Sequence, residues 1–174
     1  MKQTVVILDK PGKKRVRMDF DQKGEKKELI ALVLGRAKGE YELEVIVDHQ
    51  RGRTFGRVMI RGIAKNQANV KVTGTIIIAK KAQGVDDFLE MKLLILDDKS
   101  QAWAEPRLEI KANEVKASHA ATVGQVDEEQ RFYLMSRGLT EHGAEQLLVK
   151  GFLGQVISKI TDVKMKRKVY AKSQ

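Results

Sequence analysis

Three histidines and the absence of cysteine limit the chemistry open to this chain of 174 residues. Cysteine thiolates hold disulfides, many zinc sites and iron–sulfur clusters, so none of these can depend on thiols of this chain. His119 is the candidate metal ligand, because a neutral imidazole can bind a metal and this one shares a strand face with Val115 and Ala117. No second ligand stands near it, which on chemistry alone favours a structural role. His49 and His142 are predicted to lie at the surface.

The carboxylates and nucleophiles show no catalytic pattern. Asp86-Asp87 and Asp97-Asp98 flank apolar runs, where acids commonly solubilise turns. The sequence has no Gly-x-Ser-x-Gly, Walker, Gly-x-Gly-x-x-Gly or His-Glu-x-x-His motif. A sugar-processing β-helix enzyme would need carboxylates gathered on one face, whereas these are scattered. We therefore predict a protein that is not an enzyme.

Lysine and arginine outnumber aspartate and glutamate by 33 to 23, which gives a formal net charge of +10. Residues 1–30 carry +4 and residues 164–172 carry +5, so the long middle of the chain carries only +1. One internal cluster can bind phosphate or form a solvated strand face: Arg51, Arg53, Arg57, Arg61 and Lys65. A basic solenoid that binds an anionic partner is thus an alternative function. Nucleic acid is disfavoured as that partner, because the charge is mostly terminal and aromatic residues make up only 5%.

Residues 1–124 are predicted to form a β-rich core. Runs rich in valine, isoleucine and leucine recur between turn signals, and several alternate with a period of two. In residues 41–47 the odd positions are apolar, and in residues 107–112 the even positions are. The predicted strands are Thr4–Leu8, Arg15–Phe20, Leu29–Leu34, Tyr41–Val47, Arg57–Ile63, Asn69–Ile78, Phe88–Leu96 and Arg107–Lys116.

Residues 125–162 are predicted to form a helical subdomain, followed by a basic tail over residues 163–174. Asp127 is a suitable N-cap for a first helix, which Gly138 would end. Thr140 can cap a second helix, which Gly151 would end, and Phe152–Ile160 would form a third. The basic tail is predicted to be disordered in solvent.

Strands followed by helices indicate an α+β protein that is mainly β. Alternation alone fits both an antiparallel β-sandwich and the coils of a β-solenoid. No apolar run approaches the roughly 20 residues of a membrane span, and the first residues lack a secretory signal pattern. We therefore expect a cytoplasmic protein with no membrane contact.

Four ordered blocks resemble the core and C-terminal end of the SufB/SufD family, the scaffold components of the Suf machinery for iron–sulfur cluster assembly. The resemblance runs from about residue 104 to residue 160, and its second block, which contains Ser118-His119, is closer to SufD than to SufB. It implies a right-handed parallel β-helix followed by a small helical subdomain. The blocks are Pro106-Arg107-Leu108-Glu109-Ile110, Val115-Lys116-Ala117-Ser118-His119-Ala120-Ala121-Thr122-Val123-Gly124, Phe132-Tyr133-Leu134-x-Ser136-Arg137-Gly138, and Ala144-x-x-Leu147-Leu148-x-x-Gly151-Phe152.

The resemblance also implies roles for particular residues. His119 matches the SufD histidine implicated in cluster assembly where two protomers meet, so a transient iron–sulfur cluster at that interface is expected, with no cofactor held by this chain alone. The partners it implies are a SufC-type ATPase and, through the β-helix, a SufB-like chain or a second copy. The residues that match the family's helical block and SufC contact are Phe132, Tyr133, Arg137, Gly138, Leu147, Leu148, Gly151 and Phe152.

The sequence departs from the family in three ways. It lacks the cysteine of SufB, so a partner would have to supply thiolates, which soft iron sites prefer. Ala120 replaces the glycine that usually follows the SufD histidine. Family members are longer and carry an N-terminal helical domain that has no counterpart here. The chain is therefore expected to contribute one imidazole, or to keep only the fold and the docking surface.

Overall fold

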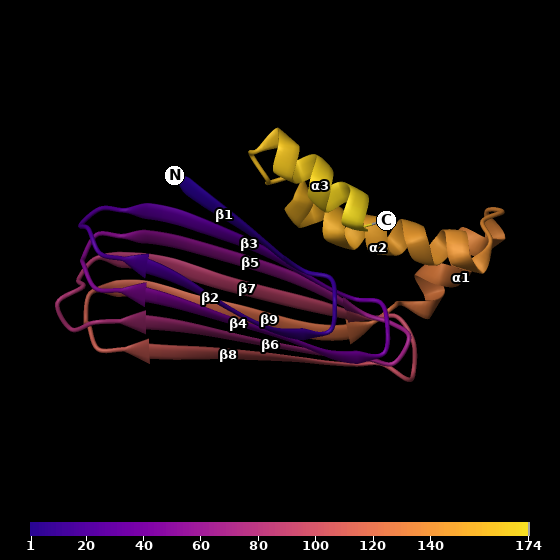
Figure 1. Ribbon diagram of the computed structural model, residues 1–174, viewed down its shortest axis with the longest axis horizontal. Coiled ribbons are helices and arrows are strands. Elements are labelled where there is room, and N and C mark those ends of the chain that lie inside the picture. Colours follow the sequence, from indigo (N-terminus) through magenta and orange to yellow (C-terminus); the bar gives the residue numbers. More distant parts are fainter. Residues whose placement is uncertain (174) are drawn as a thin grey trace.

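The structure is a computed structural model that describes residues 1–173. Within these residues, nine strands precede three helices (Figure 1). The strands are β1 (Lys2–Leu8), β2 (Gly12–Phe20), β3 (Lys26–Gly35), β4 (Gly39–His49), β5 (Phe55–Ala64), β6 (Ala68–Ile78), β7 (Val85–Ile95), β8 (Gln101–Ile110) and β9 (Val115–Gln125). The helices are α1 (Glu128–Ser136), α2 (Glu141–Ile157) and α3 (Val163–Ser173).

Every strand pairing in the described part is parallel, and the strands form two sheets. One sheet has the order β1-β3-β5-β7-β9 and the other β2-β4-β6-β8, so the chain alternates between sheets as it winds. Leu43 lies beside Val72, 29 residues on, and Gly62 beside Leu93, 31 residues on. Each coil therefore stacks on the preceding one, which confirms a parallel β-helix and excludes the antiparallel sandwich.

The main core lies between the two sheets. In β4 the odd positions Tyr41, Leu43, Val45 and Val47 are buried, as the period of two predicted. Successive side chains of a strand point to opposite faces, so each strand sends alternate residues into this core. Parallel strands need a long connection back to the same sheet, and here the strand of the other sheet supplies it.

A second core lies outside the five-stranded sheet, beneath α2 and α3. Ile30, Leu32 and Leu34 of β3 pack there against residues such as Leu153 and Val169 of the helices. The same strand sends Leu29, Ala31 and Val33 into the main core. Burial on both faces explains why residues 29–34 are a continuous apolar run with no alternation.

The helices differ from the prediction at Gly151 and in the C-terminal tail. Gly151 does not end a helix, because α2 continues through it to Ile157. The reason is that Val149, Leu153 and Val156 form one apolar stripe that packs against the sheet, and this burial outweighs the low helix propensity of one exposed glycine. The caps Asp127 and Thr140 are confirmed, since each accepts backbone N–H bonds at its helix start.

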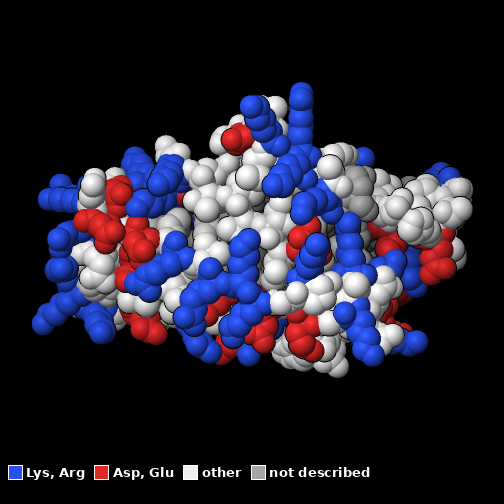
Figure 2. Space-filling view, viewed as in Figure 1, with Lys and Arg blue, Asp and Glu red and all other residues white. Residues whose placement is uncertain are grey.

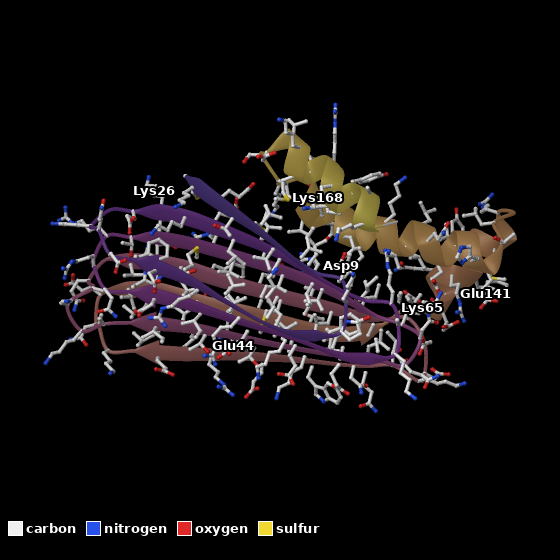
Figure 3. All side chains as sticks on the ribbon, in the orientation of Figure 1. Asp9, Lys26, Glu44, Lys65, Glu141 and Lys168 are labelled. Atoms are coloured by element: carbon white, nitrogen blue, oxygen red, sulfur yellow. The ribbon has the colours of Figure 1, made fainter. Side chains whose placement is uncertain are left out.

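The predicted disordered tail is instead helix α3 over the described residues, with Gln174 outside them. Val169 is fully buried in the second core. Lys172 forms an ion pair with Asp9, which lies beneath α3 in Figure 3. Arg36 donates to the carbonyl oxygens of Lys172 and Ser173 at 2.9 and 2.5 Å, which satisfies the end of the helix. Partial burial lowers the pKa of Arg36 from its ordinary value.

The predicted strand Arg107–Lys116 is two strands, because β8 ends at Ile110 and β9 begins at Val115. The turn between them buries Ala112. This residue continues the apolar alternation of β8, so the sequence pattern did not show the break between the strands. None of the described helices is both long enough and apolar enough to cross a membrane.

Candidate functional site

The last coil leaves the β-helix open at one end. β8 and β9 are the edge strands of their sheets, so each has one side without a strand neighbour in the described part of the chain. His119, Ala121 and Val123 of β9 lie beside Leu89, Met91 and Leu93 of β7, which are buried in the main core.

These three residues of β9 therefore face the interior of the β-helix, yet all are exposed. We call this region the open end; its inward-facing residues are Ala104, Pro106, Leu108, Ile110, Ala117, His119, Ala121 and Val123.

His119 lies at the centre of β9 and faces the interior side of its sheet. Val115 and Ala117, four and two residues earlier, pack against the main core, which confirms that the three residues share a face. No group of three or more histidine, cysteine, aspartate or glutamate side chains among residues 1–173 is placed to hold a metal. The open end thus presents a single imidazole.

A hollow of about 610 Å³ lies beside the start of β8 and the end of β9. Its lining is mostly apolar or small: Lys71, Ala102, Trp103, Ala104, Glu105 and Val123. Trp103 is 49% exposed although it is the largest apolar side chain in the region. Unpaired strand edges beside exposed apolar surface are the usual setting for pairing with another chain.

Helices α1 and α2 carry a second exposed apolar surface. Phe132, Tyr133 and Leu147 are 73%, 56% and 47% exposed, respectively. A hollow of about 420 Å³ lies between α1, α2 and the end of β9, and Leu147 lines it. We call this surface the helical face; its residues are Phe132, Tyr133, Leu147, Leu148, Gly151 and Phe152.

The remaining residues of the family's helical block shape the end of α1. The Arg137 guanidinium lies 5.2 Å from the centre of the Tyr133 ring, a cation–π contact. Gly138 has a φ of +94°, the left-handed conformation that ends a helix as predicted. Ala144 is buried, whereas Leu147, three residues later on α2, points to solvent.

The basic cluster of the sequence does not form one surface. Arg51 and Arg53 are exposed in the turn between β4 and β5. Arg57 pairs with Asp86 at 2.8 Å and stacks on Phe55 with its guanidinium 3.8 Å from the ring centre.

Arg61, expected on a solvated strand face, is instead buried below α2. It pairs with Glu90 at 2.8 Å, and its guanidinium lies 5.9 Å from the centre of the Phe152 ring. Burial raises the pKa of Glu90, but hydrogen bonds from Arg61 and Lys92 outweigh it and hold that pKa below its ordinary value.

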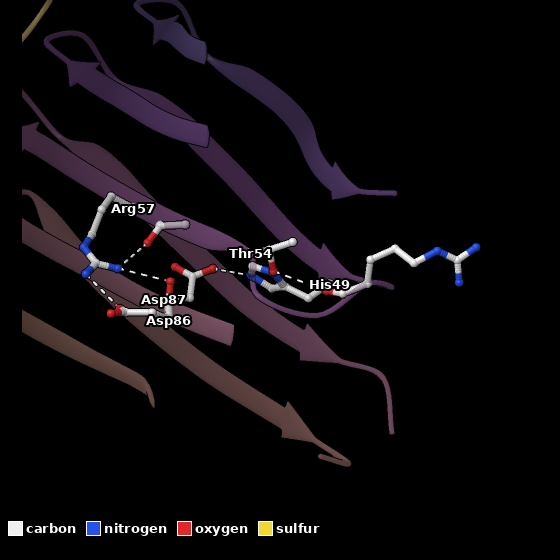
Figure 4. Close-up of polar contacts among 7 residues, drawn as sticks. His49, Thr54, Arg57, Asp86 and Asp87 are labelled. Atoms are coloured by element: carbon white, nitrogen blue, oxygen red, sulfur yellow. Dashed lines mark hydrogen bonds and ion pairs between the residues drawn. The ribbon is translucent and has the colours of Figure 1, made fainter. Parts of the chain in front are cut away.

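His49 is fully buried, contrary to its predicted surface position. Its Nε2 lies 2.6 Å from Asp87 Oδ2 and its Nδ1 2.7 Å from Thr54 Oγ1 (Figure 4). The Phe20 ring stacks on the imidazole, and the two ring centres lie 4.2 Å apart. A Cβ atom at Gly56 would come within 2.3 Å of Asp87 Oδ2, so any larger residue there would displace this carboxylate. The sequence held the missed signal, because His49 shares the parity of the inward residues of β4.

Thr54, His49 and Asp87 have the residue types of a nucleophile, a base and an orienting acid. His49 is 0%, Thr54 1% and Asp87 1% exposed, so no substrate can reach the hydroxyl in this structure. Asp87 was expected to solubilise a turn, and it instead closes a buried hydrogen-bonded group. The three residues therefore stabilise the coil and are not a site.

Comparison with known proteins identifies the family. Residues 4–152 match the model described as SUF system FeS cluster assembly, SufBD core domain. An iron–sulfur cluster assembly SufBD family protein of Mycobacterium leprae is 33% identical over 160 residues, which cover 87% of this chain and 41% of that protein.

The iron–sulfur cluster assembly protein SufD of Escherichia coli is 31% identical over 126 residues, which cover 72% of this chain and 30% of SufD. A SufBD family protein of Synechocystis is 28% identical over 153 residues, covering 87% of this chain and 33% of that protein. The chain thus spans well under half the length of these relatives. Because the SufBD core model covers most of its length, and parallel coils and C-terminal helices lie where the resemblance placed them, the chain belongs to the SufB/SufD family of the Suf system for iron–sulfur cluster assembly.

Proposed function

We propose that this protein is a non-enzymatic, SufD-like scaffold that pairs with a second Suf chain through the open end and binds a SufC-type ATPase through the helical face. The observation that carries the proposal is the open end itself, where unpaired edges of both sheets surround exposed apolar residues and one imidazole. A second β-helix can extend both sheets there and cover Trp103 and Val123.

The second chain would be a SufB-like protein or another copy of this one. An iron–sulfur cluster assembled at the joint is cargo, and His119 would contribute one nitrogen to it. This chain has no cysteine, so the thiolates must come from the other chain. A SufB-like partner meets this requirement, whereas a homodimer offers two imidazoles and no thiolate.

The helical face supports the ATPase contact on different grounds. Exposed aromatic side chains are typical anchors of protein interfaces, and Phe132 is the most exposed large apolar side chain of the described residues. Neither Phe132 nor Tyr133 contributes to either core, so their exposure does not serve the fold.

We predict that the double substitution Phe132→Ala and Tyr133→Ala weakens capture of a co-expressed SufC-type ATPase by roughly 10- to 100-fold, since interface aromatics commonly contribute 2 kcal/mol or more. Affinity would be measured by pull-down and surface plasmon resonance. Val163→Ala with Tyr170→Ala is the matched control, because both side chains are also exposed but lie on α3. Equal capture by the double variant and the parent would refute the proposed contact.

Deleting the helices would not test ATPase binding alone, because α2 and α3 also cover Ile30, Leu32 and Leu34 of β3. A chain shortened before α1 would expose that apolar surface and aggregate. Point substitutions on the helical face avoid this difficulty.

We predict that His119→Ala keeps pairing and ATPase binding but lowers the yield of cluster on the reconstituted complex several-fold. The imidazole is exposed, so its removal should change the free energy of unfolding by less than about 0.5 kcal/mol. Iron and sulfide content, with the visible absorption of the cluster, gives the yield. An unchanged yield would assign His119 a structural role.

A further inference from the structure

Four cations surround a hollow on the turns that lead from the four-stranded sheet to the five-stranded one. The hollow holds about 350 Å³ and is lined by Lys23, Arg51, Gly52, Arg53, Lys81 and Gln83. We call its charged members, Lys23, Arg51, Arg53 and Lys81, the turn cluster. They come from three successive turns, which lie at the left in Figure 1, and lysine and arginine side chains project furthest from that end in Figure 2.

The turns stack directly on one another. Gly24 N donates to Gly52 O at 3.2 Å, and Arg53 N donates to Gln83 O at 2.8 Å. A Cβ atom at Gly52 would come within 2.3 Å of Gln83 O, so the second and third turns are in close contact. Neighbouring coils of a parallel sheet lie about 4.8 Å apart. The charges of the turn cluster are therefore held together by the backbone.

At several other positions, opposite charges pair across adjacent coils. Lys13 pairs with Glu42 at 2.8 Å, Arg15 with Glu44 at 2.6 Å and Arg57 with Asp86 at 2.8 Å, each across one coil of 29 residues. At the same spacing, Arg51 is followed by a second cation, Lys80.

Among the described residues, none of the four cations of the turn cluster has a carboxylate within 4.0 Å. Like charges on adjacent coils destabilise a sheet, so this arrangement costs stability unless an anion lies between them.

The nearby carboxylates either pair with other cations or do not line the hollow. Glu25 pairs with Lys27 at 3.0 Å, and Asp86 pairs with Arg57. Asp21 and Glu114 belong to the first and last turns but do not line the hollow. The hollow therefore carries an uncompensated positive potential.

We propose that the turn cluster is a binding site for a small molecule that bears a chain of two or more phosphate groups. A chain of phosphates can accept charge-assisted hydrogen bonds from cations on successive turns, whereas a single phosphate reaches fewer of them. No aromatic side chain lines the hollow, so it has no platform for stacking bases, which argues against single-stranded nucleic acid. The site lies on the first three turns, separate from the open end, and is independent of the proposed scaffold function.

The test is isothermal titration calorimetry of the full chain with inorganic tripolyphosphate at low ionic strength. The variant Lys23→Gln, Arg51→Gln, Lys81→Gln removes one charge from each turn and spares Arg53, whose φ of 57° makes it a poor place to substitute. The control Lys10→Gln, Lys38→Gln, Lys99→Gln removes three exposed charges from the opposite turns, so the change in net charge is the same.

We expect the parent and the control to bind tripolyphosphate with affinities within about twofold of each other, and the turn-cluster variant to bind at least about tenfold more weakly. Inorganic phosphate should bind the parent more weakly than tripolyphosphate. Three results would overturn the proposal: no binding to the parent, equal loss in the variant and the control, or binding of an oligonucleotide or a polyglutamate peptide in place of tripolyphosphate. Circular dichroism checks that both variants are folded.

Discussion

Replacing His49 with alanine is expected to lower the free energy of unfolding by about 3–5 kcal/mol. His49 supplies the one hydrogen bond that the described residues give to the Asp87 carboxylate, whose other oxygen is buried without a partner. The substitution would leave that carboxylate alone in the interior and remove the ring that stacks on Phe20. Stability in urea, followed by circular dichroism, gives the measurement.

His142→Ala is the matched control, because His142 is exposed and its loss should change the free energy by less than about 0.5 kcal/mol. If His49→Ala does not fold, the double variant His49→Phe with Asp87→Leu tests whether the loss of stability comes from the Asp87 carboxylate being left without a partner. Replacing a whole buried polar pair with apolar residues is often tolerated, so this double variant should recover most of the loss. A loss below about 1 kcal/mol in His49→Ala would contradict the structural role assigned to this group.

Ala121→Glu is expected to weaken pairing with the second Suf chain by a factor of 100 or more. Ala121 faces the interior side of β9 at the open end, so a partner that extends the sheets must bury it. An unpaired carboxylate buried at such a joint costs about 3–5 kcal/mol, which corresponds to roughly 150- to 5,000-fold in affinity. Because Ala121 is exposed in the single chain, the variant should fold normally.

Analytical ultracentrifugation of the co-expressed chains measures this effect. Ala37→Glu serves as the control, since Ala37 is equally an exposed alanine but lies in a turn away from the open end. Parent-like pairing by Ala121→Glu would mean that the open end is not the joint.

The sequence predicted the fold well where burial follows a local pattern. Residues 41–47 alternate because only one face of β4 enters the main core, and Asp127 and Thr140 cap helices through contacts three residues away at most. The resemblance chose between the sandwich and the solenoid, which alternation could not do. The helix boundary at Gly151 was wrong because burial against the sheet, a contact distant in sequence, decided it.

The candidate sites depend on contacts about 30 residues apart, which local patterns do not show. His49 looked like a surface residue because Asp87, 38 residues later, is its partner. Arg61 looked solvated because the two residues that cover it, Glu90 and Phe152, lie far along the chain. A search for opposite charges 29 residues apart would have found the Lys13–Glu42 and Arg57–Asp86 pairs. The exposure of His119 follows from β9 being the last strand of its sheet, which a predicted strand alone does not reveal.

Amide hydrogen exchange of the chain, alone and in complex with a co-expressed SufB-like protein, tests the central claim most directly. We expect the complex to slow exchange in residues 101–110 and 115–125, because strand pairing at the open end engages backbone groups that face solvent in the single chain. Exchange in β1 and β2, at the other end of the coil stack, should not change. Protection confined to β1 and β2, or no change in β8 and β9 within a stable complex, would contradict the account.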